Sequence, residues 1–179
     1  MSTTEQVYGR KELMHRIGKA AEEEVGRSLA FLFGHRNVSY GVDGFSTGTD
    51  GYPDIKINYK DNLFYVEVKS IIPFVKRYNK NGGYNRVNAV KLNKESWVRL
   101  KERARAKIAT IIMIVEVRLI GDNDYFIIDY DTLEDFVITS TAKEWVHIPL
   151  HYILMKCKKI EYKESEFIVN PIETNQKRI

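Results

Sequence analysis

Two neighbouring stretches of the chain alternate between apolar and polar residues. Residues 52–59 place two isoleucines on one side and Asp54 on the other. Residues 63–70 place two valines on one side and Glu67 and Lys69 on the other. Side chains along a strand point alternately to its two faces, so each stretch predicts a strand with one apolar face. A short polar segment joins the two, and the pattern therefore predicts a hairpin with both carboxylates and the lysine on its polar face.

Helical periodicity lies on either side of this predicted hairpin. Residues 13–33 bring their apolar side chains onto one stripe at 100° per residue, and Gly34 suits the position that ends a helix. Residues 91–106 also have a helical pattern, with Asn93 as a candidate N-cap. We therefore expect one helix before the hairpin and another after it.

The first of these helices contains three consecutive glutamates. In projection Glu23 points almost directly away from the apolar stripe, Glu24 lies near its far margin, and Glu22 lies on the inward margin. An acidic patch in solvent accounts for Glu23. A glutamate at the margin of the core can reach a neighbouring metal site, so Glu22 is a candidate for chemistry.

The remaining apolar segments complete an α/β domain. Residues 35–42, 108–119 and 124–130 are predicted strands, and Asp131 can cap a short helix that ends at residue 136. The predicted order is α-β-β-β-α-β-β, with helices flanking a central sheet. The expected divisions are a flexible N-terminus at 1–12, a core at 13–138, an extension at 139–170 that packs on the core or on a dimer partner, and a tail at 171–179.

Length and composition fit a single domain that does not enter a membrane. The chain has 179 residues, of which 44% are hydrophobic and 29% are charged. Cys157 is the only cysteine, which excludes an internal disulfide and favours a reducing compartment. The start of the chain lacks the apolar run of a secretory signal, and the most apolar run, residues 111–115, is too short to cross a bilayer. We expect a cytoplasmic protein.

Positive charge gathers in one part of the chain. The formal net charge is +4, yet residues 74–107 carry eleven Lys or Arg against two Glu, which leaves the rest at −5. Residues 71–89 interleave cations with aromatic side chains, which can neutralise phosphates and stack on bases. An ordinary loop is polar too, so the position directly after Lys69 is the better reason to expect contact with nucleic acid. The candidate contact residues are Lys76, Arg77, Tyr78, Lys80, Tyr84, Arg86 and Lys91.

The polar face of the predicted hairpin suits a divalent metal. Mg²⁺ prefers oxygen ligands from one or two carboxylates, with phosphate and water completing its shell. Asp54 and Glu67 suit this role, and Glu22 could add a contact through water or to a second metal. Lys69 would orient or deprotonate an attacking water. The set suits phosphodiester hydrolysis, although an edge hairpin whose charges only face solvent would show the same pattern.

Pro53-Asp54, followed by Glu67-Val68-Lys69, resembles the PD-(D/E)xK signature of the restriction-endonuclease-like nucleases. The resemblance implies a restriction-endonuclease-like core with a mixed sheet, and the backbone carbonyl of Val68 as a further metal ligand. It also implies Mg²⁺, for which Mn²⁺ can substitute, and products with 5′-phosphate and 3′-hydroxyl ends.

Both predicted helices extend this resemblance. Gly18-x-x-x-Glu22 is similar to the first helix of nucleases of the Holliday-junction-resolvase and Mrr-like kind. The segment LNKESWVRLKERA resembles the helix that follows the catalytic strand of these nucleases. By this resemblance Glu22 completes the acidic cluster.

These features predict a Mg²⁺-dependent endodeoxyribonuclease. Small size and the lack of a recognisable sequence-reading domain favour a structure-specific, junction-resolving enzyme that acts on DNA as a homodimer. A type II restriction endonuclease is the alternative within this class, and a non-catalytic nucleic-acid-binding module is the alternative in another class. A binder has no use for clustered acids facing a phosphate backbone, which favours the enzyme.

Other constellations carry little chemistry. His147 and His151 are four residues apart, as on one helix face, but no third ligand is evident. Cys157 lacks the partner of a CxxC pair, which argues against zinc. Nothing resembles a dinucleotide fingerprint, so we expect no small-molecule cofactor.

Overall fold

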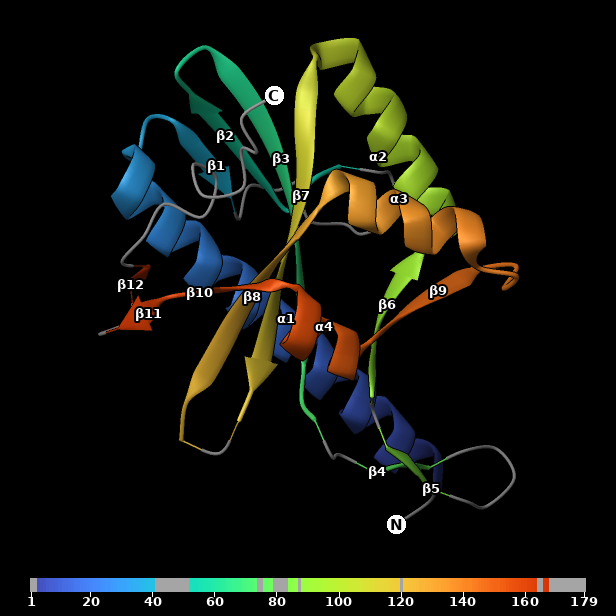
Figure 1. The fold of residues 1–179 in the computed structure, drawn as a ribbon. Helices are drawn as coiled ribbons and strands as arrows, with labels where there is room; N and C mark the ends of the chain where they lie inside the picture. The colour runs from blue at the N-terminus through green and yellow to red at the C-terminus, as the bar shows by residue number, and fades with distance from the viewer. Residues whose placement is uncertain are drawn as a thin grey trace.

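A six-stranded mixed sheet forms the centre of the protein, with α1 on one face and α2, α3 and α4 on the other (Figure 1). The computed structural model describes residues 3–40, 52–73, 76–78, 84–86, 88–119, 121–163 and 166–167. The helices are α1 (Thr3–Phe33), α2 (Lys94–Lys107), α3 (Tyr130–Thr139) and α4 (Leu150–Lys156). The predicted class, α/β with a central mixed sheet flanked by helices, is confirmed.

The strands of the central sheet follow the spatial order β1-β2-β3-β7-β8-β10. Their bounds are β1 (Val38–Tyr40), β2 (Ile55–Tyr59), β3 (Asn62–Ile71), β7 (Ala109–Arg118), β8 (Asn123–Asp129) and β10 (Lys158–Ile160). Among the described strands of this sheet only β3 and β7 pair in parallel, and the chain between these two strands contains α2. Further two-stranded sheets within the described ranges pair β4 (Lys76–Tyr78) with β5 (Tyr84–Arg86), β6 (Ala89–Asn93) with β9 (Trp145–Pro149), and β11 (Tyr162–Lys163) with β12 (Glu166–Phe167).

The predicted hairpin is present as β2 and β3. Lys60 and Asp61 connect the two strands with φ angles of 49° and 63°, so both adopt the left-handed conformation of a tight two-residue turn. Such turns match the twist of the flanking strands and fix the register between them. Here Ile55 lies opposite Val66 and Ile57 opposite Phe64.

Two cores lie on opposite faces of the sheet. Val66 and Val68 of β3 pack with buried residues of α1, such as Val25 and Leu29. Tyr65, one position away, packs on the other face with the buried residues of α2, α3, α4 and the β6–β9 pair. Each fully buried large apolar side chain contributes roughly 1.5–3 kcal/mol relative to exposure. The alternation of β3 therefore fixes which face each of its polar side chains takes.

The N-terminal helix is longer than predicted. It begins at Thr3, where the sequence pattern predicted a flexible segment through residue 12 and a helix from residue 13. The reason is that residues 5–12 contain helix-forming types and no proline, although they lack the apolar stripe that the prediction required. The predicted end is confirmed, because Gly34 takes a left-handed φ of 87° directly after Phe33.

Two other helix starts differ from prediction. Residues 91–93 belong to β6, so α2 begins at Lys94, and Asn93 caps it by accepting the N–H of Ser96 at 3.0 Å. The N-cap of α3 is Asp129 rather than Asp131, since Asp129 accepts the N–H of Thr132 at 2.8 Å. Tertiary pairing of β6 with β9 overrides the helical periodicity of residues 91–93.

Segment 71–89 contains more regular structure than the sequence indicated. The β4–β5 ribbon and β6 lie between β3 and α2, where we expected no strand. His147 lies in β9 and His151 in α4, so the two histidines do not share a helix face. No helix in the described part of the chain is long and apolar enough to span a membrane.

Gly26 and Gly18 of α1 offer a matched test of how the helix packs. A Cβ added at Gly26 would overlap the ring of Tyr40 in β1 and lie 2.9 Å from its Cβ, whereas a Cβ at Gly18 would meet nothing within 4 Å. Gly26→Ala should lower the free energy of unfolding by about 1–3 kcal/mol through overpacking. Gly18→Ala should raise it by up to about 1 kcal/mol through helix propensity. Urea denaturation compares the two, and equal stabilisation by both would contradict this packing.

Candidate active site

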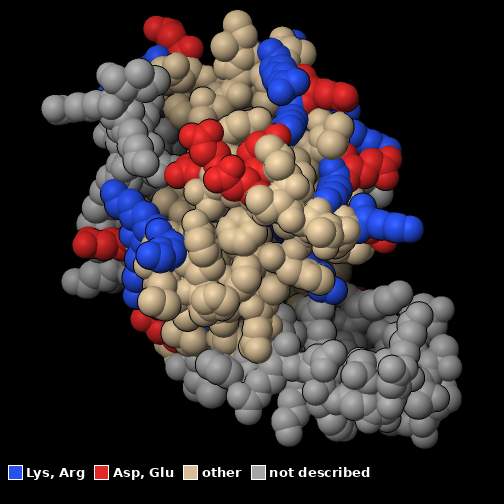
Figure 2. All heavy atoms as spheres, turned by 45° about the vertical axis from the view of Figure 1, so that its right-hand side comes forward, with Lys and Arg blue, Asp and Glu red and all other residues tan. Residues whose placement is uncertain are grey.

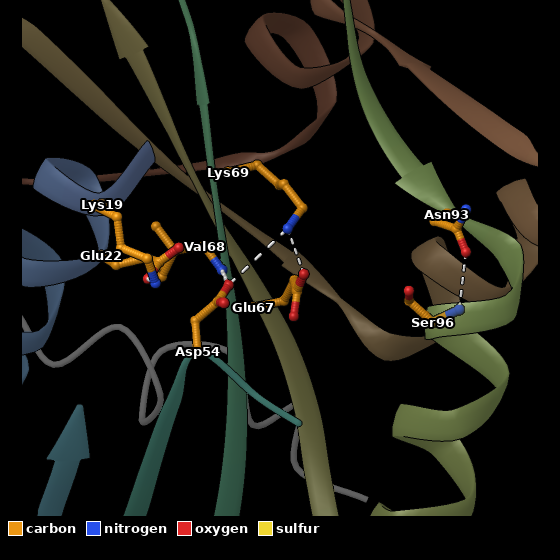
Figure 3. A network of polar contacts seen from close by, with 8 residues as sticks. All are labelled: Lys19, Glu22, Asp54, Glu67, Val68, Lys69, Asn93 and Ser96. Carbon is orange, nitrogen blue, oxygen red and sulfur yellow. Dashed lines mark hydrogen bonds and ion pairs between the residues drawn. The ribbon is translucent and has the colours of Figure 1, made fainter. Parts of the chain in front are cut away.

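Asp54 directly precedes β2, at the place where the neighbouring strand β3 extends beyond the paired residues. Ile55 is paired with Val66, so β3 runs on for several residues beyond the last pair of this ladder. No residue of β2 pairs with β3 beyond Val66, and the carboxylate of Asp54 supplies a hydrogen-bond acceptor there. Its Oδ2 accepts the N–H of Val68 at 2.7 Å (Figure 3). Pro53, which is buried, precedes it and restricts the backbone there. The side chain of Asp54 is 12% exposed, so it is held at the margin of the core and still open to solvent.

Glu67 and Lys69 stand beside Asp54 on the face of β3 opposite to α1. They are two residues apart, so they share a face, and they form an ion pair with each other. The Nζ of Lys69 also lies 4.0 Å from Oδ2 of Asp54. The ammonium therefore contacts both carboxylates, as Figure 3 shows. The three side chains that the sequence predicted to converge do so.

Glu22 approaches the same place from α1. Its Oε2 accepts from the Nζ of Lys19 at 2.7 Å, and its side chain is 19% exposed. Figure 3 places Glu22 on the far side of Asp54 from Glu67 and Lys69. Because β2 does not cover this edge of β3, groups from the two faces of the sheet can meet across it. The predicted position of Glu22 at the core margin agrees with its partial burial.

Negative charge is crowded in this cluster. Burial raises the pKa of Glu67 to about 7, and repulsion from Asp54 acts in the same direction, against the attraction of Lys69. Burial and Asp54 also raise the pKa of Glu22, although Lys19 opposes them. A bound cation would relieve this repulsion, and such perturbed carboxylates are typical of functional sites.

Lys69 is held in its charged form. Burial alone would lower its pKa, but the attraction of Glu67 and Asp54 and the hydrogen bond to Glu67 outweigh burial and raise it. An ammonium donates hydrogen bonds and cannot accept a proton. The charged form suits the predicted role of orienting an attacking water, and the other predicted role, deprotonating that water, would require the neutral amine.

The carboxylates do not form a complete metal shell by themselves. Among the residues that the structure describes, no group of three or more His, Cys, Asp or Glu side chains is arranged to hold a metal ion. Glu22 therefore does not join Asp54 and Glu67 as a third direct ligand in this conformation. Mg²⁺ often uses only one or two carboxylates and keeps several waters. Asp54 and Glu67 fit such a site.

The predicted nucleic-acid contacts lie on different elements. Lys91 is an exposed residue of β6, and Lys80 lies outside the described residues. The other five belong to the β4–β5 ribbon, in which Lys76 lies opposite Arg86, Arg77 opposite Asn85 and Tyr78 opposite Tyr84. Along the chain this ribbon is the next element after β3, the strand that carries Lys69, and residues 72–75 lie between them.

Two further residues around the site were not predicted from the sequence. Lys19 pairs with Glu22, and its signal was the i, i+3 spacing of opposite charges on a helix. Glu116 of β7 is fully buried and accepts from Ser70 Oγ at 2.6 Å, next to Lys69 in β3. Arg118 Nε and Asn123 Nδ2 also donate to Glu116, at 2.6 and 3.1 Å. Its signal was a lone acid in an apolar strand, which requires buried partners.

Comparison with known proteins gives a distant structural likeness. No family model matches the chain, and no curated protein matches it. Thirteen chains of solved structures match. One is Hjc, a Holliday junction resolvase from the archaeal hyperthermophile Archaeoglobus fulgidus, with 14% identity and a TM-score of 0.46 over 73% of this chain and 89% of that chain. A likeness this distant does not establish what this chain binds or cuts.

Glu67→Gln should stabilise the metal-free protein at pH 8 and have little effect at pH 4.5. The pKa of Glu67 rises from 4.5 to about 7 on folding, so folding is favoured less as the pH rises through this window. Glutamine removes the charge, and the gain at pH 8 should be on the order of 1 kcal/mol or more. Urea denaturation in EDTA at both pH values measures it.

Glu134→Gln is the matched control. Hydrogen bonds from Lys101 and Trp97 outweigh burial and lower the pKa of Glu134, so this substitution should destabilise the protein at pH 8. A Glu67→Gln variant that is less stable than the parent at pH 8 would show that the pairing with Lys69 outweighs the crowding of charge.

Proposed function

We propose that this protein is a Mg²⁺-dependent endonuclease that hydrolyses DNA phosphodiester bonds. The observation that carries the proposal is the convergence of Asp54, Glu67 and Lys69 at the open edge of β3. Asp54 and Glu67 bind the metal, together with the backbone carbonyl of Val68, and Mn²⁺ can replace Mg²⁺. Glu22 contributes through a water molecule.

Each residue has a separate role in the proposed reaction. When bound, Mg²⁺ would supply a more acidic water and would offset the charge that develops on the phosphate oxygens. Lys69 donates hydrogen bonds to the attacking water and to a phosphate oxygen, which orients the one and stabilises the other. The water oxygen bonds to phosphorus and releases a proton to solvent, the bond to the 3′ oxygen breaks, and that oxygen takes a proton from solvent. The products carry 5′-phosphate and 3′-hydroxyl ends.

The hydrogen bond from Val68 supports this division of roles. It holds Asp54 through Oδ2, so the fold itself positions this carboxylate. Preorganised groups spend no energy on reorientation during the reaction. The partial exposure of Asp54, Glu67 and Lys69, at 12%, 16% and 30%, leaves the cluster accessible to a phosphate from solvent.

We further propose that the substrate is a branched DNA, such as a four-way junction, and that the enzyme works as a homodimer in the cytoplasm. One chain has one such cluster within its described residues, and resolving a junction requires two cuts. A two-fold dimer presents two equivalent sites in fixed geometry. The β4–β5 ribbon, with Lys76, Arg77 and Arg86, would contact phosphates beside each site.

Substitutions of the site should abolish cleavage without unfolding the protein. Asp54→Asn and Glu67→Gln should each lower the initial rate of Mg²⁺-dependent cleavage by roughly 10²-fold or more, and Lys69→Met by roughly 10²–10⁴-fold. Asp124→Asn is the control, because Asp124 is also a partly buried carboxylate with a lysine partner, Lys159, but lies on β8. Undiminished cleavage by Asp54→Asn or Glu67→Gln would exclude those residues as metal ligands.

A panel of labelled substrates separates the kinds of nuclease. The junction-resolving proposal predicts paired cuts in a four-way junction and little cleavage of plain duplex, all dependent on Mg²⁺. Discrete fragments from long duplex DNA would instead identify a restriction endonuclease. Tight binding of every substrate with no cleavage in Mg²⁺ or Mn²⁺ would identify a non-catalytic binding module.

A further inference from the structure

A hollow of about 480 Å³ opens between α2 and the segment that leads into β2. Its lining residues are Tyr52, Arg99, Glu102, Arg103 and Ala106. The guanidinium carbon of Arg103 lies 3.6 Å from the centre of the Tyr52 ring, which is a close cation–π contact. An aromatic ring and two guanidinium groups therefore meet in one recess.

The hollow faces one stripe of α2. Its four helical residues lie at positions i, i+3, i+4 and i+7, which share a helix face. Another face carries Trp97 and Leu100 into the core. A third faces α3, where Lys101 pairs with Glu134 and the charge of Arg105 also acts on Glu134. The helix thus directs Arg99 and Arg103 toward the hollow and Arg105 away from it.

The hollow lies beside the carboxylate cluster. Tyr52 precedes Asp54 by two residues. Arg103 lies close enough to Tyr65 for its charge to act on that hydroxyl, and Tyr65 precedes Glu67 by two residues on the same face of β3. A strand of DNA whose phosphate reaches Asp54 and Glu67 therefore has its next nucleotide within reach of the hollow.

The charge of the hollow is mixed, because Glu102 lines it together with the two arginines. On the face that Figure 2 shows, the lysine and arginine side chains of the described residues lie scattered among acidic and uncharged ones. Arg99 forms an exposed ion pair with Glu95, and such pairs contribute little and can be exchanged for a phosphate. Guanidinium groups bind phosphate through two parallel hydrogen bonds.

We propose that this hollow binds the nucleotide next to the scissile phosphate. Arg99 and Arg103 contact its phosphate, and Tyr52 stacks against its base or sugar. The inference rests on the proposed nuclease function, because it needs a DNA strand that passes the carboxylate cluster. It adds a substrate-positioning site that the signature residues do not contain.

The test measures DNA binding by the full chain in an Asp54→Asn background, so that no cleavage interferes. Affinity for a fluorescent four-way junction is measured between 50 and 200 mM KCl. Arg99→Gln and Arg103→Gln should each lower the slope of log affinity against log salt by about 1. Arg105→Gln on the α3 side of the same helix is the control, and its slope should stay near that of the parent. Equal slopes for all four proteins, equal losses in all three variants, or no binding by the parent would overturn the proposal.

Tyr52 tests the stacking contact separately. Tyr52→Ala should weaken binding roughly 5- to 100-fold, whereas Tyr52→Phe should bind like the parent. If Arg103→Gln proves unstable, Arg103→Lys serves as a second variant. It keeps the positive charge, so its salt slope should match that of the parent. If Arg103 only supports Tyr52 and Asp54, its loss will slow cleavage in the Asp54 parent and leave the salt slope unchanged, which would also overturn the proposal.

The two proposals fail in different ways. Cleavage that depends on Asp54 and Glu67, together with unaltered salt slopes, would refute the hollow and leave the nuclease intact. Altered slopes for Arg99 and Arg103 without any cleavage by the Asp54 protein would refute the nuclease, while the hollow would remain a DNA contact.

Discussion

The hydrogen bond from the Val68 N–H to Asp54 is the contact on which the site depends. A sheet strand that continues past its neighbour leaves backbone donors without a partner, and burying such a donor costs about 1–3 kcal/mol. Asp54 accepts the hydrogen bond of such a donor, the Val68 N–H, and this bond also holds the Asp54 carboxylate in position. The same bond brings a carboxylate to the one edge of β3 that groups from both sheet faces can reach. Glu22 approaches this edge from α1, and Glu67 and Lys69 from the opposite face.

In this arrangement, carboxylates that repel one another are held together at the edge of a well-packed sheet. Three partly buried carboxylates share the ammonium groups of Lys69 and Lys19, and the raised pKa values of Glu22 and Glu67 show that their charged forms are disfavoured. A site selected only for stability would carry fewer acids here. The two apolar cores on either side of β3, and the buried Glu116 that holds Ser70, stabilise this strand against that repulsion.

The hairpin and its site could be predicted because their signals are local. Alternation placed Ile55 and Val66 on one face, and a two-residue spacing placed Glu67 with Lys69. The end of α1 could be predicted from Gly34 alone, because a left-handed backbone conformation depends on the residue type at that one position. The PD-(D/E)xK resemblance then connected Asp54 to Glu67, which are thirteen residues apart.

The features that escaped prediction depend on distant partners. The pairing of β6 with β9 joins residues 52 to 60 positions apart, and it converts residues 91–93 from a predicted helix into a strand. The hollow beside Tyr52 exists only because α2 packs next to the start of β2. The burial of Glu116 required partners from β3 and β8 that no local pattern indicates.

The most direct test of the central claim is to locate the metal. Crystals of the protein soaked in Mn²⁺ would show an anomalous difference peak at the metal. The account predicts one strong peak in contact with the carboxylates of Asp54 and Glu67, and its loss in crystals of the Asp54→Asn variant. A peak elsewhere, or no peak between these two side chains at millimolar Mn²⁺, would contradict it.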